Sequence, residues 1–518
     1  MKKLASRILA AILIATLSLS LIACGGNGEQ TGDGVLDCAV TSGLTSLTPF
    51  VSNGGRDAFY WKMTYESLGY MNYNKELTPW VAKEWSVSDD NLTYTVTIHD
   101  NVYDSAGNHI TASDICWFIG EAVNQALKPV FNKLESWEQV DEYTFSMTLK
   151  SNMIGVFEYL MEDIFVVSEA AYKASPDGFA TECVSTNQYK ITEFVASSDW
   201  KYELREDYWG NPEDLCEEIR GIVPAVKFHV IAEASQVTAA FATDLVDYMD
   251  GATINIVSEM LNNPDDYTVL QYEGHQGYQL FFSGYETSPV ADDVKLRQAI
   301  CYAIDNQALI DGYCQGLGSM LYDVCPSFYK GYQTSWESEE YYTFNQEKAK
   351  ELVAESNYDG TTSMKILVGQ WGSRVAEIIV NELAAVGIKA EVFSPEAALL
   401  MAIRLDGSNY DMFINTIGGT YLPDHWSIRY DPNAYATGDG TSRHDYVLGE
   451  LLYKTWTVEG FTTENINEVH NYLKDNAIAY GLFNQNNFCV YSNKLTLEKE
   501  VDGFTHKCYP FASTWSGI

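Results

Sequence analysis

The feature that most constrains how this chain folds is an alternation of apolar and polar residues between positions 92 and 98. The apolar positions are Leu92, Tyr94, Val96 and Ile98, and the residues between them are threonines. A period of two in β-branched and aromatic residues predicts a strand with one buried face. The same alternation returns between residues 143 and 149, which predicts a second strand of the same kind.

A helix start is predicted between these two strands. Thr111 is followed three residues later by Asp114, a spacing close to that of a capping box, and an apolar run follows. Two half-buried strands with a capped helix between them predict a compact α+β unit of roughly a hundred residues.

The N-terminus has the form of a processed leader. Lys2, Lys3 and Arg7 precede an apolar run over residues 8–22, which is too short to span a membrane comfortably. The four residues ending at Cys24 resemble a bacterial lipobox, in which the cysteine is lipidated. The alternative is an ordinary signal peptide with a chance cysteine. We expect a glycine-rich tether after Cys24 and a protein anchored to the membrane through its lipid.

The charge balance limits the partners of the chain. Asp and Glu number 71 against 32 Lys and Arg, which gives a formal net charge of −39. Such a chain repels nucleic acid and anionic lipid headgroups and stays apart from its own copies. We therefore expect no nucleic-acid partner and a monomeric protein.

Ten cysteines are scattered along the chain. If Cys24 carries lipid, nine remain, so at least one stays unpaired. A chain of this length buries enough core without disulfides, and we expect most cysteines to be small buried hydrophobic residues. A bridge between Cys314 and Cys325 is possible but not indicated. Neither a CxxC nor an HExxH pattern occurs, so no zinc site and no cofactor are predicted.

A parallel βαβ unit is predicted late in the chain. Residues 364–368 form an apolar run, and apolar residues then recur at helical spacing between 375 and 386. Gly387 is a natural helix stop, and residues 388–393 return as a strand. A right-handed crossover would join the two strands.

Several segments, in order along the chain, resemble the family 5 solute-binding proteins of ABC importers, the oligopeptide-, dipeptide- and nickel-binding group. They are Tyr65-Glu66-Ser67-Leu68, Val294-Lys295-Leu296-Arg297-Gln298-Ala299 through Asp305, and Phe344-Asn345-Gln346-Glu347-Lys348-Ala349. The resemblance implies an α/β, two-lobed periplasmic-binding-protein-like fold of type II, in its large three-domain form, with a hinge between the lobes. The ligand would be enclosed between them.

The resemblance also implies a division of the chain. The expected segments are a leader (1–23), a tether (24–35), the first part of lobe I (36–58), an inserted α+β domain II (59–184), the middle part of lobe I (185–268), lobe II (269–485) and the C-terminal part of lobe I (486–518).

A loop after a late strand carries the main ligand prediction. In peptide-binding relatives this loop holds an aspartate that pairs with the ligand's amino terminus. The loop here contains Gly418, Gly419, Thr420 and Tyr421, and Thr420 occupies the aspartate's position. A neutral hydroxyl cannot replace a buried carboxylate opposite an ammonium group. Asp424 is a candidate substitute if the loop is shifted.

Other positions are predicted to line the cleft. They are Trp117, which matches an aromatic cleft residue of relatives; Gln370 and Trp371, which follow a strand end; Phe483, which matches an aromatic wall; and Thr41, Ser42 and Gly43, which follow the first mature strand. Each has an alternative role in packing.

The predicted function is that of a lipid-anchored receptor that captures an oligopeptide and delivers it to an ABC permease. An oligosaccharide is the alternative ligand, because 35 Tyr and 12 Trp supply flat apolar faces with polar edges. A metal-chelate receptor has little support, because the eight histidines are spread widely and His425 and His444 are merely near one another in sequence. An exported lipoprotein enzyme is disfavoured, since no GxSxG, SxxK or P-loop pattern stands out.

Overall fold

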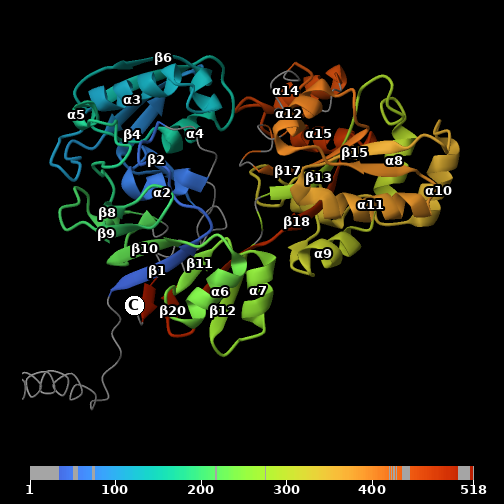
Figure 1. Ribbon diagram of the computed structural model, residues 1–518. Helices are drawn as coiled ribbons and strands as arrows, with labels where there is room; N and C mark the ends of the chain where they lie inside the picture. The colour runs from blue at the N-terminus through green and yellow to red at the C-terminus, as the bar shows by residue number, and fades with distance from the viewer. Residues whose placement is uncertain are drawn as a thin grey trace, which may run out of the picture.

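The computed structural model describes residues 34–50, 56–72, 76–215, 219–272, 274, 276–418, 421, 423, 426, 429–433, 444–499 and 514–516. The predicted leader, Cys24 and most of the tether lie outside these residues, as do Gly419, Thr420 and Asp424. Figure 1 shows two bodies side by side, connected near their lower ends. The larger body combines lobe I with domain II, and the other is lobe II.

Lobe I is built on a mixed seven-stranded sheet. Its order is β12 (Tyr267–Tyr272), β19 (Asn487–Ser492), β11 (Tyr248–Asp250), β1 (Val35–Val40), β10 (Ala225–Val230), β9 (Trp200–Leu204) and β8 (Tyr189–Phe194). Helices α2 (Arg56–Thr64), α6 (Ala234–Ala242) and α7 (Ile254–Leu261) accompany it, together with the pair β20 (Thr496–Lys499) and β21 (Thr514–Ser516). The sheet therefore gathers strands from three separate parts of the chain.

Domain II confirms the predicted α+β unit. Its antiparallel sheet has the order β4 (Ala82–Val87), β5 (Thr93–Ile98), β7 (Thr144–Leu149) and β6 (Leu134–Gln139). Its other elements are β2 (Gly69–Met71), β3 (Leu77–Pro79), α3 (Ala112–Asn124), α4 (Val156–Asp163) and α5 (Glu169–Ala174). Val96 and Ile98 are buried. The capping box forms, with the Thr111 backbone N–H donating to Asp114 Oδ2 at 2.9 Å.

Lobe II is a six-stranded sheet with helices on both faces. The order is β14 (Gly318–Ser319), β18 (Ala479–Gln485), β13 (Gln276–Phe282), β17 (Met412–Gly418), β15 (Met364–Leu367) and β16 (Ala390–Phe393). The helices are α8 (Val294–Ala303), α9 (Asn306–Cys314), α10 (Gln346–Glu355), α11 (Ser373–Ala385), α12 (Ala397–Asp406), α14 (Tyr446–Thr455) and α15 (Thr463–Asp475).

The predicted βαβ unit is confirmed within lobe II. Strands β15 and β16 pair in parallel, and α11 connects them. Gly387 ends the connection with φ of 86°, a conformation that favours glycine. On β13, Leu280 and Phe282 enter one core, while Phe281 enters the core on the opposite face. Both faces of this sheet are therefore covered, as the fold class requires.

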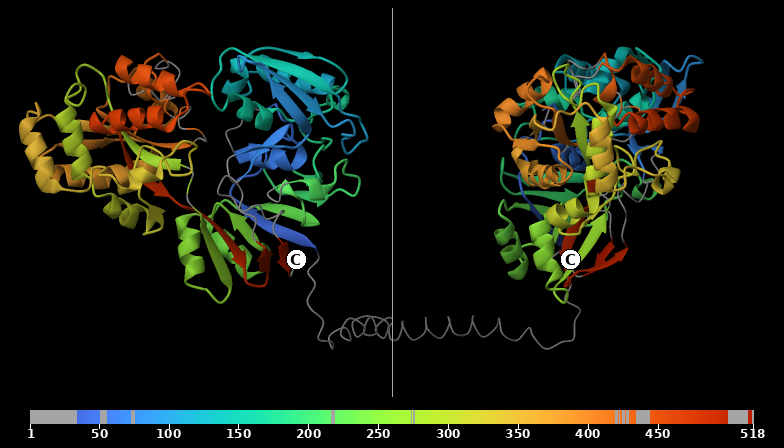
Figure 2. Two further views of the ribbon diagram at one scale, coloured as in Figure 1. Left: turned by 180° about the vertical axis from the view of Figure 1, so that it is seen from behind. Right: turned by 90° about the vertical axis from the view of Figure 1, so that its right-hand side faces the viewer.

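Two described segments cross between the lobes. Strand β12 of lobe I leads to β13 of lobe II, and β18 of lobe II leads back to β19 of lobe I; Figure 2 shows this last crossing in red. The crossings touch, because Asn484 Nδ2 donates to the Gly274 carbonyl at 2.6 Å. A Cβ at residue 274 would overlap the Gln485 carbonyl oxygen. The connection therefore requires glycine.

The cysteines follow the expectation from sequence. Cys314 and Cys325 are both buried, and Cys314 is a free thiol, so the two are not joined to each other. Among the other described cysteines, Cys38, Cys301 and Cys489 are buried, and Cys116 and Cys183 are half-buried. None of the helices in the described part of the chain is long and apolar enough to cross a membrane. The predicted domain boundaries stay a prediction.

The hinge packing generates a first prediction. Gly274→Ala forces a methyl group into a backbone carbonyl, which no side-chain rotation relieves, so we expect a loss of about 2–3 kcal/mol in stability. Calorimetric melting of the mature chain measures this. Gly120→Ala is the control, because Gly120 lies in α3 and the nearest atom that an added Cβ would meet is 3.9 Å away. This variant should be neutral or stabilising. Equal melting temperatures for both variants would contradict the tight hinge.

Candidate functional site

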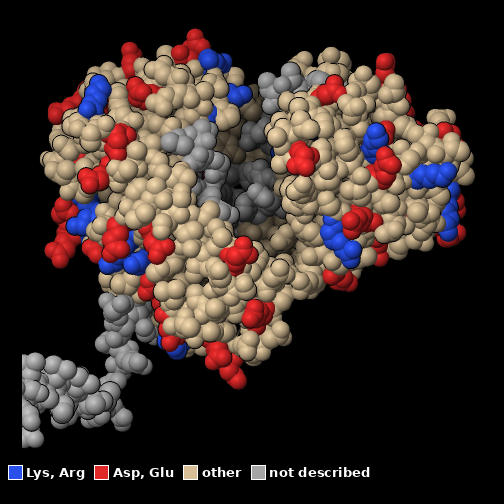
Figure 3. All heavy atoms as spheres, in the orientation of Figure 1, with Lys and Arg blue, Asp and Glu red and all other residues tan. Residues whose placement is uncertain are grey.

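The sheet topology of lobe II brings several predicted residues to one edge. Strand β15 runs parallel to β17, and Gln276 at the start of β13 lies opposite Gly418 at the end of β17. The carboxyl ends of β15 and β17 therefore point to the edge where β13 and β18 join the hinge. Gln370 and Trp371 follow β15, and Phe483 lies two residues before the end of β18. Figure 3 shows a hollow between the two lobes on this side.

An aromatic cluster includes two of the predicted residues. Phe483 is fully buried and stacks on Tyr278 at 4.4 Å between ring centroids. Trp371 lies edge-on to Tyr278 at 5.6 Å and is 44% exposed. Tyr313 completes the group, because its hydroxyl lies 3.0 Å from that of Tyr278 and donates to the Trp371 carbonyl at 3.3 Å. The contacts with Tyr278 and Tyr313 thus hold Trp371 in place, while its side chain stays open to solvent. Gln370 is exposed beside it.

The predicted residues after β1 lie at the surface of lobe I. Thr41, Ser42 and Gly43 are half-buried. A Cβ at residue 43 would lie within 3.0 Å of backbone atoms of Ser197 and Ser198. Gly43 is therefore required for close packing between two loops of lobe I. A role of these three residues in ligand contact stays a prediction.

Trp117 is held by packing inside domain II. Its ring lies edge-on to Phe50 at 5.6 Å and close to Tyr172 of α5 at 5.3 Å. Figure 1 places α5 on the side of the larger body away from lobe II. These contacts favour the packing alternative, and contact of Trp117 with a ligand remains a prediction.

Tyr421 lies in the contact between domain II and lobe II. Its side chain is fully buried, and its ring packs on Gly155 and on Tyr159 of α4, with 5.8 Å between the two tyrosine rings. Lys330 Nζ donates to its hydroxyl at 3.4 Å. Burial, and then the neighbouring Glu158 carboxylate, raises the pKa of Tyr421. The enclosed Tyr421 ring fills the contact between domain II and lobe II. Contact of Tyr421 with a ligand stays a prediction.

A small apolar cluster surrounds Tyr421 and joins all three parts of the molecule. Its buried members are Tyr70, Met71, Trp80, Ile219 and Tyr421. Half-buried side chains from domain II and lobe II pack against it, including Ile154, Tyr159 and Phe461. The lobes therefore touch through packed side chains as well as through the hinge.

Next to this cluster lies a buried carboxylate, Glu66, whose side chain is not exposed at all. It accepts hydrogen bonds from Trp80 Nε1 at 2.9 Å, from Trp209 Nε1 at 2.7 Å and from the Tyr208 hydroxyl. Burial raises its pKa from 4.5 to about 8, against the opposing effect of these donors. Glu66 thereby connects domain II to the segment that follows β9 of lobe I.

Glu66 generates a second prediction. Because its pKa is raised in the folded protein, the folded state favours the neutral acid. The stabilisation is complete below pH 4.5 and is lost as the pH rises through about 8. We expect the stability of the wild type relative to Glu66→Gln to fall between pH 5 and pH 8, by roughly 1 kcal/mol per pH unit, in melting experiments. Parallel pH profiles of the two proteins would contradict a raised pKa.

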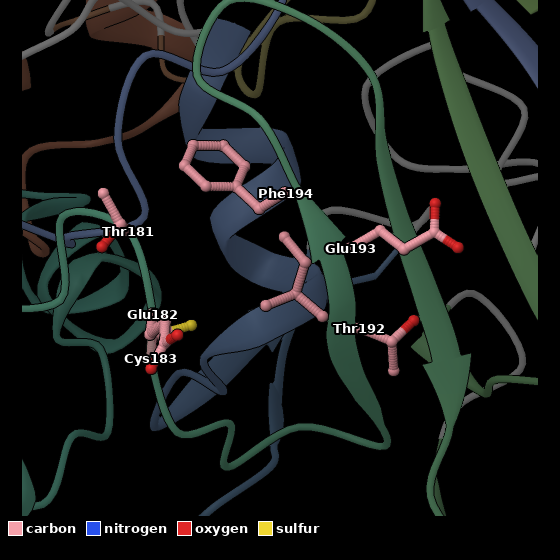
Figure 4. A pocket seen from close by; sticks show the side chains of 7 residues that line it. Thr181, Glu182, Cys183, Thr192, Glu193 and Phe194 are labelled. Atoms are coloured by element: carbon pink, nitrogen blue, oxygen red, sulfur yellow. The ribbon is translucent and has the colours of Figure 1, made fainter.

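A separate cavity of about 450 Å³ lies outside the hollow between the lobes. Two segments line it, the loop residues Thr181, Glu182 and Cys183 and the strand residues Ile191 to Phe194 of β8, as Figure 4 shows. Strand β8 is the edge strand of the lobe I sheet, on the side away from lobe II in Figure 1. Its position excludes it from the predicted cleft.

Metal-ligating residues are not grouped in the part of the chain that the structure describes, where no set of three or more His, Cys, Asp or Glu side chains could hold an ion. His444 Nδ1 lies 3.1 Å from the Pro432 carbonyl, whereas His425 lies outside the described residues.

Two α/β lobes joined by two crossing segments, with a hollow between them, define the class of type II periplasmic binding proteins. The family model for bacterial extracellular solute-binding proteins, family 5, matches residues 76–436. The chain therefore belongs to this family, whose members bind small-molecule ligands outside the cytoplasm for ABC importers. The resemblance and the fold class expected from sequence are confirmed.

Individual relatives are distant in sequence. The chain is 23% identical to heme-binding protein A of Haemophilus influenzae over 358 residues, 62% of this chain and 63% of that protein. It is 22% identical to the dipeptide-binding protein of Escherichia coli over 410 residues, 70% of this chain and 73% of that protein. The chain thus spans somewhat less than two thirds of the first relative and somewhat more of the second.

Solved structures resemble nearly the whole chain. The ABC transporter substrate binding protein CtaP from Listeria monocytogenes matches with a TM-score of 0.80 at 17% identity, covering 95% of this chain and all of that one. DppA from Helicobacter pylori, in complex with the peptide STSA, matches with a TM-score of 0.71 at 19% identity, covering 92% and 98%. At these identities the likeness shows the fold.

Sequence reasoning missed the residues that support the predicted ones. Tyr278 packs against both Phe483 and Trp371, yet it lies on strand β13, whose sequence contains no recognisable motif. Glu66 lies in a segment that resembles the family, but nothing in sequence marked its burial. The sequence signal for the Tyr278–Phe483 contact was the presence of an aromatic residue near one end of each strand, β13 and β18. That signal becomes informative only when the two strands are known to pair.

Proposed function

We propose that this protein is a monomeric, lipid-anchored receptor that captures a peptide in the cleft between its lobes and delivers it to the permease of an ABC importer. Family membership supports the receptor role. Two of its relatives, from Escherichia coli and Helicobacter pylori, carry dipeptide or peptide in their names or titles, which supports a peptide as ligand. The supporting observation in this chain is the half-exposed Trp371, held by Tyr278 at the hinge edge of lobe II.

The chemistry of this edge favours recognition through apolar faces and neutral polar groups. Trp371 offers an open ring, and the hydroxyls of Tyr278 and Tyr313, which lie 3.0 Å apart, stand beside it. Thr420 replaces the aspartate that would pair with a free amino terminus, so affinity would come from the peptide backbone and side chains. The same aromatic ring favours the alternative ligand, an oligosaccharide, because sugar rings also stack on tryptophan.

A ligand screen on the mature chain tests this proposal. Di- to pentapeptides and α- and β-oligosaccharides are compared by thermal shift, and ligand at a hundred times Kd should stabilise by about 2.7 kcal/mol. We expect peptides to raise the melting temperature. If only glycans do so, the ligand is an oligosaccharide, and the peptide assignment fails.

Trp371→Ala tests the place of binding with the ligand so found. We expect affinity to fall about tenfold or more, because an exposed tryptophan face contributes strongly when a ligand covers it. Tyr103→Ala is the matched control, since Tyr103 is 41% exposed and stacks on His109 in domain II. Unchanged affinity in the Trp371 variant would remove this residue from the site.

The lipid anchor is a separate part of the proposal and has its own test. Cys24→Ala removes the sulfur that would carry the lipid, so we expect the full-length variant to leave the membrane fraction. Mass spectrometry of the wild-type N-terminus should show a lipid-modified cysteine. A cleaved, unmodified N-terminus would indicate an ordinary signal peptide.

A further inference from the structure

The lobes are also connected by polar contacts that lie away from the hinge. The Ile154 backbone N–H of domain II donates to the Trp456 carbonyl of lobe II at 2.6 Å. Three residues further on, the Glu459 carboxylate accepts from two amides of domain II. Asn91 Nδ2 donates to Oε1 at 2.9 Å, and Asn152 Nδ2 donates to Oε2 at 3.2 Å. Both carboxylate oxygens are therefore used between lobes.

The loop that carries Glu459 has a fixed shape. The Gly460 N–H donates to Thr457 Oγ1 at 3.0 Å, and the Phe461 N–H donates to the Thr457 carbonyl at 2.9 Å. A Cβ at residue 460 would overlap the Lys454 carbonyl oxygen. The acceptor is thus presented by a tight turn that only glycine permits.

The donor side is equally constrained. Asn91 has φ of 56°, a left-handed conformation that asparagine tolerates. Its N–H donates to the Ser88 carbonyl at 2.9 Å, and the following Leu92 N–H donates to Asp90 Oδ1 at 3.1 Å. Asn152 stands two residues before Ile154, so the backbone contact and one amide contact reinforce each other. Contacts between pre-shaped groups lose little conformational entropy when they form.

Apolar packing lies beside these polar contacts. Ile154 and Phe461, which flank the polar residues in sequence, both pack against the cluster that contains Tyr421. All of these contacts are made between groups of domain II and lobe II. We name the set of Asn91, Asn152, Ile154, Trp456 and Glu459 the interlobe latch.

We propose that Glu459 is a positioning residue whose two hydrogen bonds stabilise the closed arrangement of the lobes in the absence of ligand. For a ligand that binds between closed lobes, the apparent affinity equals the intrinsic affinity multiplied by the fraction of molecules that are closed. The latch raises this fraction, so it changes the affinity of every ligand by the same factor and leaves selectivity untouched. The latch therefore sets the affinity of the receptor independently of its ligand selectivity.

The latch also suits a strongly acidic protein. Its acceptor is a carboxylate, yet both side-chain donors are neutral amides. Hydrogen bonds between a charged and a neutral group are stronger than those between neutral groups. They involve no pair of opposite charges, so salt weakens them less than it weakens an exposed ion pair.

Hydrogen exchange of the unliganded mature chain tests the latch directly. The Ile154 amide is protected only while it donates to the Trp456 carbonyl, and peptic fragments that contain Ile154 report its exchange. Glu459→Ala should raise its exchange rate about tenfold, since two charge-assisted hydrogen bonds at an exposed site are lost. Small-angle scattering of the same sample should show a larger radius of gyration.

Matched variants make the result specific. Glu450→Ala removes the same charge from α14 of lobe II, where Glu450 is exposed, and should leave exchange at Ile154 unchanged. Asn91→Gly, which keeps the left-handed conformation of residue 91, combined with Asn152→Ala should reproduce the effect of Glu459→Ala, and adding Glu459→Ala to that pair should have little further effect. An Ile154 amide that exchanges freely in the wild type, or equally in all variants, would overturn the latch.

The latch can fail independently of the receptor function. Its test uses no ligand, so a negative result leaves the peptide screen unaffected. Conversely, if the screen identifies a glycan as the ligand, we still expect Glu459→Ala to weaken glycan binding by the same factor as the binding of any other ligand.

Discussion

The contact between the two crossing segments is the constraint on which the arrangement of the molecule depends. The Gln485 carbonyl lies where any side chain at residue 274 would begin, and Asn484 donates across to Gly274. The lobe I sheet and the lobe II sheet are each assembled from distant parts of the chain, and these crossings alone among the described residues carry the backbone between them. Rotation about this narrow region moves each lobe as a unit because each has its own packed core.

The hinge lies on one side of the molecule, so contacts away from the hinge determine how the two lobes pack against each other. There the structure places neutral amides against a carboxylate, a backbone hydrogen bond, and an apolar cluster around Tyr421. Acidic side chains are scattered over the visible surface of both lobes in Figure 3, and repulsion between lobes would oppose closure. A carboxylate that accepts hydrogen bonds from neutral amides joins the lobes without adding charge repulsion between them.

Local structure was largely predictable from sequence. The alternation in 92–98, the capping box at Thr111 and the glycine stop at residue 387 each report a preference that neighbouring residues enforce, and each appears as expected. Trp371 follows strand β15, as expected, because the end of a strand is a local property, and its contact with a ligand stays a prediction. Trp117 shows the limit. Its aromatic character was visible, whereas its neighbours Phe50 and Tyr172 come from other segments.

The sequence by itself determined the elements, the family and the order of the segments, because periodicity, caps and motifs act over a few neighbouring residues. Only the tertiary structure decided which strands pair, that Glu66 is buried among three donors, and that Glu459 meets Asn91 and Asn152 across the lobes. These contacts join residues up to several hundred positions apart. Their energies arise from burial and geometry that no local pattern records, and for this reason the closure of the molecule could not be predicted before its fold.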